Sequence, residues 1–187
     1  MNRALDVAIA GAGLVVTSPF LAAGALAVKL QDGGPVLYRQ TRVGRDGEDF
    51  ELLKLRTMIV GAEKQGAGFA VDKGDTRITK VGRLLRRLSV DELPQLWNVV
   101  RGEMSVIGPR PTLRYQVDKY DERQLHRLDV KPGITGWAQV NYPYGESDED
   151  AVEKLKYDLY YIRHYSLKLD AMIVLKTIHT MLFGKGR

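Results

Sequence analysis

An uncharged apolar run of 22 residues, from Val7 to Val28, is the feature that most limits what this chain can fold into. A helix of about 20 apolar residues matches the hydrocarbon thickness of a bilayer, so the simplest interpretation is a transmembrane span. A cleaved signal peptide is a second interpretation, because Arg3 precedes the run and small residues lie near its end.

Two details of the run point to a third interpretation, a broken helix that enters and leaves the membrane by the same face. Ser18-Pro19 interrupts the run near its middle, and a proline inside a helix removes one backbone hydrogen bond and bends the helix. Arg3 and Lys29 flank the two ends, so the basic residues give no clear direction for crossing. In a broken helix, the Ser18 hydroxyl would help to satisfy the backbone groups that Pro19 frees. These residues alone leave all three interpretations open.

The remainder of the chain has the composition of a compact globular domain. Of the 187 residues, 44% are hydrophobic and 27% are charged, a balance that excludes a disordered chain. Turn residues at 31–35 separate the membrane segment, residues 1–30, from the domain at 31–187. The fold class we predict is mainly α with a minor β-hairpin. The hairpin is expected at 36–38 and 50–55, and the helices at 78–88, 91–100, 112–128, 148–165 and 169–183.

The charge of the chain indicates an anionic partner. The net charge is +5 and there is no cysteine. Nucleic acid, anionic lipid headgroups and phosphorylated substrates all suit a basic surface. The chain lacks the interleaved aromatic and basic residues typical of nucleic-acid binding, so no nucleic-acid partner is expected.

An acidic pair at the predicted start of a helix is the strongest candidate for chemistry. Asp91 and Glu92 lie just before Pro94, so Asp91 fits the N-cap position. Capping alone explains such residues, because the helix dipole favours acids there. The functional alternative is that a helix N-terminus binds phosphate, and that a carboxylate beside it attacks phosphorus to form an acyl phosphate.

Basic residues that would suit a diphosphate occur on both sides of this pair. Arg110 stands between two prolines, which hold a planar guanidinium on a constrained backbone. Arg87, in a cluster with Arg83 and Arg86, suits either substrate binding or a lipid-facing surface. Lys54 and Arg56 add two cations at a predicted strand end.

Six motifs in order make the chain resemble the bacterial sugar transferase family, the monotopic phosphoglycosyl transferases. The resemblance covers essentially the whole chain. The motifs are Tyr38-Arg-Gln-Thr-Arg-Val-Gly44, Lys54-Leu-Arg-Thr-Met58, Ser89-Val-Asp-Glu-Leu-Pro-Gln95, Gly108-Pro-Arg-Pro111, Lys131-Pro-Gly-Ile-Thr-Gly-Trp-Ala-Gln-Val140 and Tyr157-Asp-Leu-Tyr-Tyr-Ile162.

The resemblance implies roles that the spacing of residues does not supply. It implies a re-entrant helix broken at Ser18-Pro19 and a catalytic dyad, Asp91-Glu92, whose Asp forms a covalent phosphosugar intermediate. It implies Mg²⁺ at that dyad. It also implies a phosphate-binding role for Arg110 and functional roles for Lys54 and Asp170. Together with Arg56, Arg87 and Gln139, these are the substrate-binding residues that we predict.

The activity implied is transfer of a sugar 1-phosphate from a UDP-sugar to polyprenyl (undecaprenyl) phosphate, with release of UMP. The domain would face the cytoplasm on the bacterial inner membrane, where the last helix either lies among membrane lipids or packs into the core. The resemblance leaves open the sugar and whether the chain forms a homo-oligomer. Two competing hypotheses are a non-enzymatic membrane-tethered module and a direct displacement in which the dyad only holds metal.

Overall fold

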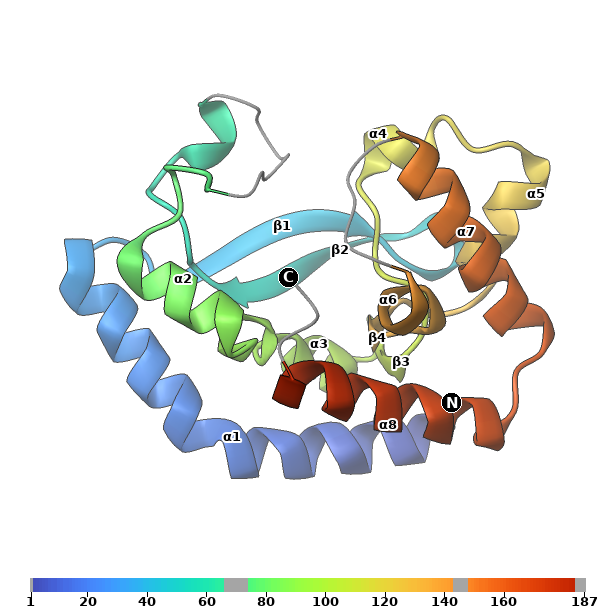
Figure 1. Ribbon diagram of the computed structural model, residues 1–187, viewed down its shortest axis with the longest axis horizontal. Helices are drawn as coiled ribbons and strands as arrows, with labels where there is room; N and C mark the ends of the chain where they lie inside the picture. The colour runs from blue at the N-terminus through green and yellow to red at the C-terminus, as the bar shows by residue number, and fades with distance from the viewer. Residues whose placement is uncertain (1, 66–73, 143–147, 184–187) are drawn as a thin grey trace.

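A computed structural model of the protein describes residues 2–65, 74–142 and 148–183. Its helices surround two small two-stranded sheets (Figure 1). The strands are β1 (Leu37–Val43), β2 (Asp49–Leu55), β3 (Ser105–Ile107) and β4 (Gly133–Thr135). The helices are α1 (Arg3–Asp32), α2 (Lys80–Arg87), α3 (Gln95–Arg101), α4 (Arg114–Val117), α5 (Glu122–Leu125), α6 (Trp137–Asn141), α7 (Asp148–Arg163) and α8 (Leu167–Phe183). Short 3₁₀ turns occupy Arg45–Gly47, Ala62–Lys64, Val90–Glu92 and His126–Asp129.

The N-terminal run forms one helix, α1, that changes direction near its middle (Figure 1). Pro19 lies inside this helix and has no N–H to donate to the carbonyl of Val15, four residues earlier. The Ser18 hydroxyl donates to that same carbonyl at 2.8 Å. The hydroxyl therefore satisfies the group that the proline leaves without its helical partner, as expected from the sequence.

Most of the apolar side chains of α1 point away from the rest of the protein. Val15 and Val16 are 75% and 71% exposed, and Phe20 and Leu30 are also exposed. By length and composition α1 is able to cross a membrane. Only 11% of its most apolar 18-residue stretch is buried inside the protein. The protein's own core therefore does not account for the apolar character of this helix.

A narrow stripe of α1 packs on the domain and joins two of its hydrophobic clusters. Ala10 is fully buried against Leu52, Val99 and Met104. Further along the helix, Val28 packs with Leu55 and Leu85 in the second cluster. Gly24 lies in this contact, where a Cβ atom would approach Leu55 Cδ1 to 2.9 Å. The absence of a side chain at Gly24 thus lets the helix approach β2 and α2 closely.

Polar contacts fix both ends of α1. Near its start, the buried carboxylate of Asp6 accepts hydrogen bonds of 2.9 Å from the Ser105 hydroxyl and from the Val106 N–H. At its end, Asp32 forms an ion pair with Arg56, a buried residue that follows β2. The helix is consequently held to the domain at two points, with its apolar outer face between them.

The two sheets correspond only partly to expectation. The predicted hairpin is confirmed and is longer than expected: β1 and β2 pair antiparallel from Leu37 opposite Leu55 to Val43 opposite Asp49. The parallel pair β3–β4 was not predicted, because strands of three residues leave too short a periodic pattern. Gly133 makes this pairing possible, since a Cβ atom there would lie 2.1 Å from the backbone nitrogen of Gly108.

The single helix predicted at 112–128 is wrong. The segment is divided into α4, α5 and the 3₁₀ turn His126–Asp129. The Asp121 side chain caps α5 by accepting from the Gln124 N–H at 2.7 Å. In return, the Gln124 side-chain oxygen accepts from the Asp121 N–H at 2.9 Å. This reciprocal capping starts a new helix inside the apolar pattern that predicted a continuous one.

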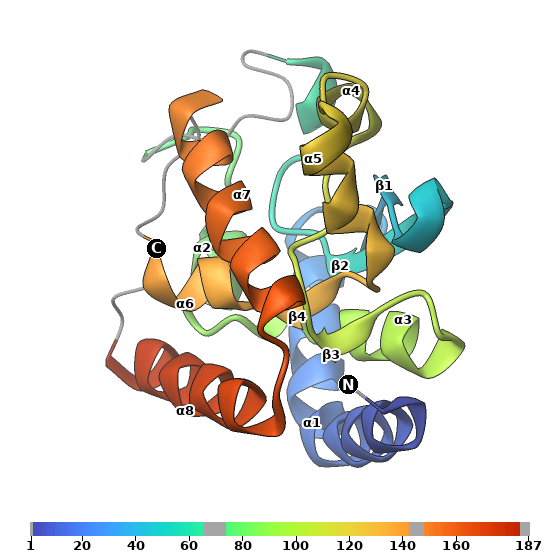
Figure 2. The same ribbon diagram turned by 90° about the vertical axis from the view of Figure 1, so that its right-hand side faces the viewer.

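The last helix, α8, packs into the core on one side, which is one of the two roles considered for it. Leu169 and Ile173 are buried in a cluster with Ile107 and Tyr161. On its other side, Leu167 and Leu175 are strongly exposed. Figures 1 and 2 show α1 and α8 along one side of the molecule, with α4 and α5 at the opposite end. The two helices that carry these exposed apolar side chains therefore lie on the same side of the molecule.

We predict that Asp6→Ala lowers the free energy of unfolding by about 2–3 kcal/mol, because it leaves one buried and one partly buried donor without an acceptor. Denaturation in detergent measures the effect. Asp118→Ala, which removes an exposed carboxylate, is the matched control and should change stability little. Equal losses in the two variants would contradict the anchoring role of Asp6.

The Asp32–Arg56 tether predicts a pH dependence of stability. Hydrogen bonds from Arg56 and from the Gly34 N–H lower the pKa of Asp32 from 3.8 to about 2. Because the folded pKa is depressed, the tether contributes in full above about pH 4 and is lost as the pH falls toward 2. The difference in Tm between wild type and Asp32→Asn should therefore narrow below pH 4. A difference that stays constant down to pH 2.5 would contradict this prediction.

Candidate active site

The acidic pair lies in a tight turn rather than at the N-cap of the following helix. Ser89 adopts a left-handed conformation, with φ at 55°, and the 3₁₀ turn Val90–Glu92 follows it. Pro94 takes the N-cap position of α3 that was expected for Asp91. The left-handed Ser89 and the 3₁₀ turn therefore both precede α3. Asp91, inside the turn, is only 4% exposed.

A buried amide sets this turn against the strand that carries Lys54. Asn98, in α3, is fully buried. Its Oδ1 accepts from the Leu53 N–H at 3.1 Å, and its Nδ2 donates to the Glu51 carbonyl at 2.7 Å. The side chain thus takes the place of a neighbouring strand beside β2. This bonding fixes the position of α3, and of the turn that leads into it, relative to Lys54.

The structure brings Glu92 together with two of the predicted substrate-binding cations. Glu92 Oε1 accepts from Lys54 Nζ at 3.4 Å and from an Arg110 guanidinium nitrogen at 3.1 Å. The side chains of Glu92 and Lys54 are mostly buried, whereas that of Arg110 is 43% exposed. Three separate sequence motifs meet at this carboxylate. Of the three side chains, the Arg110 guanidinium is the one that solvent reaches most easily.

The turn that carries Arg110 is held through its backbone carbonyls. The Pro109 carbonyl accepts from the Gly133 N–H at 2.8 Å, and the Pro111 carbonyl accepts from Arg42 at 3.1 Å. Burial, and then the positive charge of Arg110, lower the pKa of Arg42 to about 10. Two guanidinium groups therefore lie close together here, an arrangement that favours an anionic ligand between or beside them.

Other predicted residues make their contacts away from Glu92. Arg56 is directed toward α1, where it bonds Asp32 and the carbonyls of Pro35 and Met58. The Gln139 amide donates to the Ile134 carbonyl in β4 at 3.0 Å.

The remaining two predicted substrate residues form no hydrogen bond or ion pair with Glu92 in the described part of the chain. Arg87 is exposed near the end of α2. Asp170 is buried at the start of α8 and accepts from the Tyr161 hydroxyl at 2.8 Å. Burial raises the pKa of Tyr161 most, and the hydrogen bond and charge of Asp170 raise it further. The negative charge of Asp6, in α1, makes a smaller contribution in the same direction.

Gln95 was part of a quoted motif but was given no role. It is only 2% exposed, four residues after Asp91. Within the described part of the chain, its side-chain nitrogen is buried without a hydrogen-bond partner. A buried amide donor of this kind is unusual and marks Gln95 as a further polar group close in sequence to the dyad. No separate signal in the sequence distinguishes it, because a glutamine at a helix start is ordinary.

The acidic pair is consistent with magnesium that is bound partly by substrate. Among residues 2–65, 74–142 and 148–183, no three Asp, Glu, His or Cys side chains gather to hold a metal ion. Magnesium in phosphate-transfer sites is commonly held by one or two carboxylates together with substrate phosphates. Asp91 and Glu92 are the carboxylates of this site that could ligate such an ion together with a substrate phosphate.

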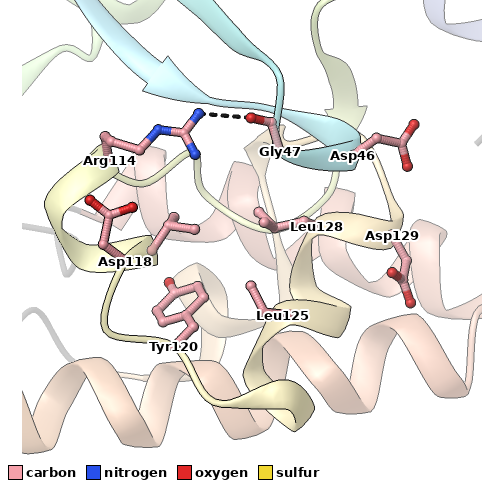
Figure 3. A pocket seen from close by; sticks show the side chains of 9 residues that line it. Asp46, Gly47, Arg114, Asp118, Tyr120, Leu125, Leu128 and Asp129 are labelled. Atoms are coloured by element: carbon pink, nitrogen blue, oxygen red, sulfur yellow. Dashed lines mark hydrogen bonds between the residues drawn. The ribbon is translucent and has the colours of Figure 1, made fainter.

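A pocket lies elsewhere in the described part of the chain and contains none of the predicted site residues. Its volume is about 520 Å³, and Asp46, Tyr120 and Leu125 are among the residues that line it (Figure 3). Arg114 bonds the Gly47 carbonyl at its edge. The pocket is formed next to α4 and α5, at the end opposite α1 and α8, so it is not the site suggested by Glu92 and its partners.

Comparison with known proteins agrees with the resemblance inferred from the motifs. The sequence model of the bacterial sugar transferase family matches residues 1–184. A UDP-N-acetylgalactosamine-undecaprenyl-phosphate N-acetylgalactosaminephosphotransferase of Aeromonas hydrophila is 44% identical over 100% of this chain and 44% of its own length. UDP-glucose:undecaprenyl-phosphate glucose-1-phosphate transferases are also 44% identical. In the Escherichia coli protein, the match covers 95% of this chain and 39% of the relative. In the Caulobacter vibrioides protein, it covers 97% of this chain and 69% of the relative.

The chain spans less than half the length of the Aeromonas and Escherichia relatives, but the matching region includes every motif of the candidate site. The family match extends from the start of the apolar helix into the last one. The chain therefore belongs to the bacterial sugar transferase family.

Proposed function

We propose that the protein transfers a sugar 1-phosphate from a UDP-sugar to undecaprenyl phosphate, releasing UMP, as the first membrane step of glycoconjugate or polysaccharide synthesis. The relatives named for this reaction use UDP-glucose or UDP-N-acetylgalactosamine. The observation that carries the proposal is the meeting of Lys54, Glu92 and Arg110 next to the buried Asp91.

Asp91 is the proposed nucleophile. Its carboxylate attacks the phosphorus that bears the sugar, the bond to the bridging oxygen breaks, and UMP leaves with that oxygen. The phosphate of undecaprenyl phosphate then attacks the resulting acyl phosphate and restores the Asp91 carboxylate. Two displacements at the same phosphorus predict ping-pong kinetics.

The neighbouring charges support this chemistry. Arg110 is the exposed cation of the cluster and is the group best able to meet an arriving phosphate. Glu92 holds Lys54 and Arg110 beside the nucleophile, so their charges are oriented before substrate binds. Magnesium, when bound, would offset negative charge on the diphosphate.

Membrane attachment through α1 fits the same proposal. An acceptor lipid keeps its tail in hydrocarbon while its phosphate reaches the protein. The exposed apolar faces of α1 and α8 lie toward one side of the molecule, and this side is the proposed contact with lipid. We propose that α1 is re-entrant, bending at Ser18-Pro19, with the domain on the cytoplasmic face of the bacterial inner membrane.

Arg110→Lys tests the role assigned to the guanidinium. Lysine keeps the charge but lacks the planar fork that binds phosphate through two nitrogens. We expect kcat/KM for the UDP-sugar to fall about 10- to 100-fold, a loss of about 1.4–2.8 kcal/mol in transition-state binding. Arg39→Lys, at an exposed ion pair on β1, is the control and should leave kcat/KM nearly unchanged. Similar values for Arg110→Lys and wild type would remove Arg110 from the site.

Asp91→Asn tests the proposed reaction as a whole. Solubilised protein is given undecaprenyl phosphate, Mg²⁺ and a panel of UDP-sugars, and UMP release is measured. We expect wild type to release UMP with at least one sugar and Asp91→Asn to lose at least about 1,000-fold in kcat, since the amide is not a nucleophile. Asp46→Asn, an exposed residue in the hairpin turn, is the matched control.

The same assay separates the competing mechanisms. A phosphosugar adduct trapped on wild type before lipid is added, and absent from Asp91→Asn, would support the covalent route. Full activity in Asp91→Asn would exclude it. A direct displacement predicts no adduct and sequential rather than ping-pong kinetics. A protein that binds anionic lipid but releases no UMP with any nucleotide sugar would be the non-enzymatic module.

A further inference from the structure

The backbone carbonyl of Arg110 is bound by a buried arginine from another part of the chain. Arg127, in the 3₁₀ turn His126–Asp129, donates from one terminal nitrogen to the Arg110 carbonyl at 2.8 Å. Its other terminal nitrogen donates to the Tyr120 hydroxyl at 2.9 Å. With the bonds to Pro109 and Pro111, each of the three carbonyls of the Pro-Arg-Pro turn accepts a hydrogen bond.

Arg127 is itself fixed by an ion pair inside the protein. Its Nε donates to Asp158 Oδ2 at 2.8 Å, and the two side chains are 9% and 2% exposed. Burial opposes the charge of Arg127, but the nearby Asp158 outweighs it and keeps the pKa of Arg127 above its usual value. The guanidinium is therefore charged, and all three of its nitrogens are used by the three partners named.

This arrangement connects α7 to the candidate site through a single side chain. Asp158 lies on α7, and Tyr120 lies between α4 and α5. Removing Arg127 would leave a buried carboxylate and a carbonyl of the turn without their charged donor, so the turn would be free to shift. A shift of about 1 Å in a group that positions substrate is enough to cost on the order of 100-fold in rate.

We propose that Arg127, oriented by Asp158 and Tyr120, is a positioning residue that fixes the Pro-Arg-Pro turn and thereby sets the guanidinium of Arg110 on Glu92 for phosphate binding. This inference rests on the proposed function. Arg127 touches no substrate in this role and acts only through Arg110. It is distinct from a residue that merely stabilises the fold, because its effect on catalysis depends on the presence of the Arg110 side chain.

A double-mutant cycle tests this dependence. Arg127→Gln is made in wild type and in Arg110→Ala, and UMP release and Tm are measured for all four proteins. We expect Arg127→Gln to lower kcat/KM about 10- to 100-fold in wild type but less than about 3-fold when Arg110 is already alanine. Tm should fall by the same amount in both backgrounds. Equal fold-losses of kcat/KM in the two backgrounds would overturn the proposal.

Arg77→Gln is the matched control, because Arg77 forms another buried ion pair, with Asp75, away from the turn. Any loss of kcat/KM that it causes should be the same in both backgrounds. A dependence on Arg110 as large as that of Arg127→Gln would also overturn the proposal, since it would show that instability alone produces the coupling.

Tyr120→Phe is the milder variant and decides the matter if Arg127→Gln does not fold. It removes only the hydroxyl that accepts from Arg127. We expect a loss of about 2- to 5-fold in kcat/KM with Arg110 present and none without it, and an equal loss in both would overturn the proposal. A wild type that releases no UMP with any UDP-sugar would overturn the proposed function, and this inference with it. An active wild type with independent losses would overturn this inference alone.

Discussion

The buried amide of Asn98 is the interaction on which the arrangement of the site depends. Sheet β1–β2 has only two strands, so one edge of β2 has backbone groups that need partners inside the protein. Asn98 supplies both a donor and an acceptor to that edge, at Glu51 and Leu53. An aliphatic residue would fill the same space but leave both groups unsatisfied. The position of α3 along β2, and hence of the turn that contains Asp91, follows from this pair of bonds.

In the site, one carboxylate is bonded to two cations before any ligand arrives. Glu92 lies between Lys54 and Arg110, and only Arg110 of these three is substantially exposed. The attraction between the Glu92 carboxylate and its two cationic partners offsets the desolvation of the two mostly buried groups, Glu92 and Lys54. Binding of a diphosphate would replace or share the contact between Glu92 and Arg110. The preformed cluster therefore reduces the reorganisation that catalysis requires, which is the condition under which electrostatic stabilisation is largest.

The sequence predicted the parts of this structure that depend on local chemistry. The hairpin, α2 and the bend at Ser18-Pro19 follow from turn residues, periodicity and the missing proline N–H, and the charged motif residues pointed to the cluster around Glu92. The role of Arg127 was not predictable, because its key partner is the backbone carbonyl of Arg110. Every residue has such a carbonyl, so the sequence does not indicate which one an arginine will bind. Arg56 was assigned to substrate from its place at a strand end, whereas its described contacts hold α1. A cation in a motif is compatible with either use, and only the position of Asp32 distinguishes them.

The tethering of α1 explains why one chain combines an apolar helix with a charged site. A narrow stripe of α1 packs on the core, where Ala10 and Val28 are buried. Asp6 and the Asp32–Arg56 pair add directional bonds near both ends. Since Arg56 follows the strand that carries Lys54, the end of the helix and the site share one rigid support. Under the proposed function, a lipid acceptor that enters along the outer face of α1 would approach Lys54 and Arg110 while the helix stays bonded to the domain at Asp6 and Asp32.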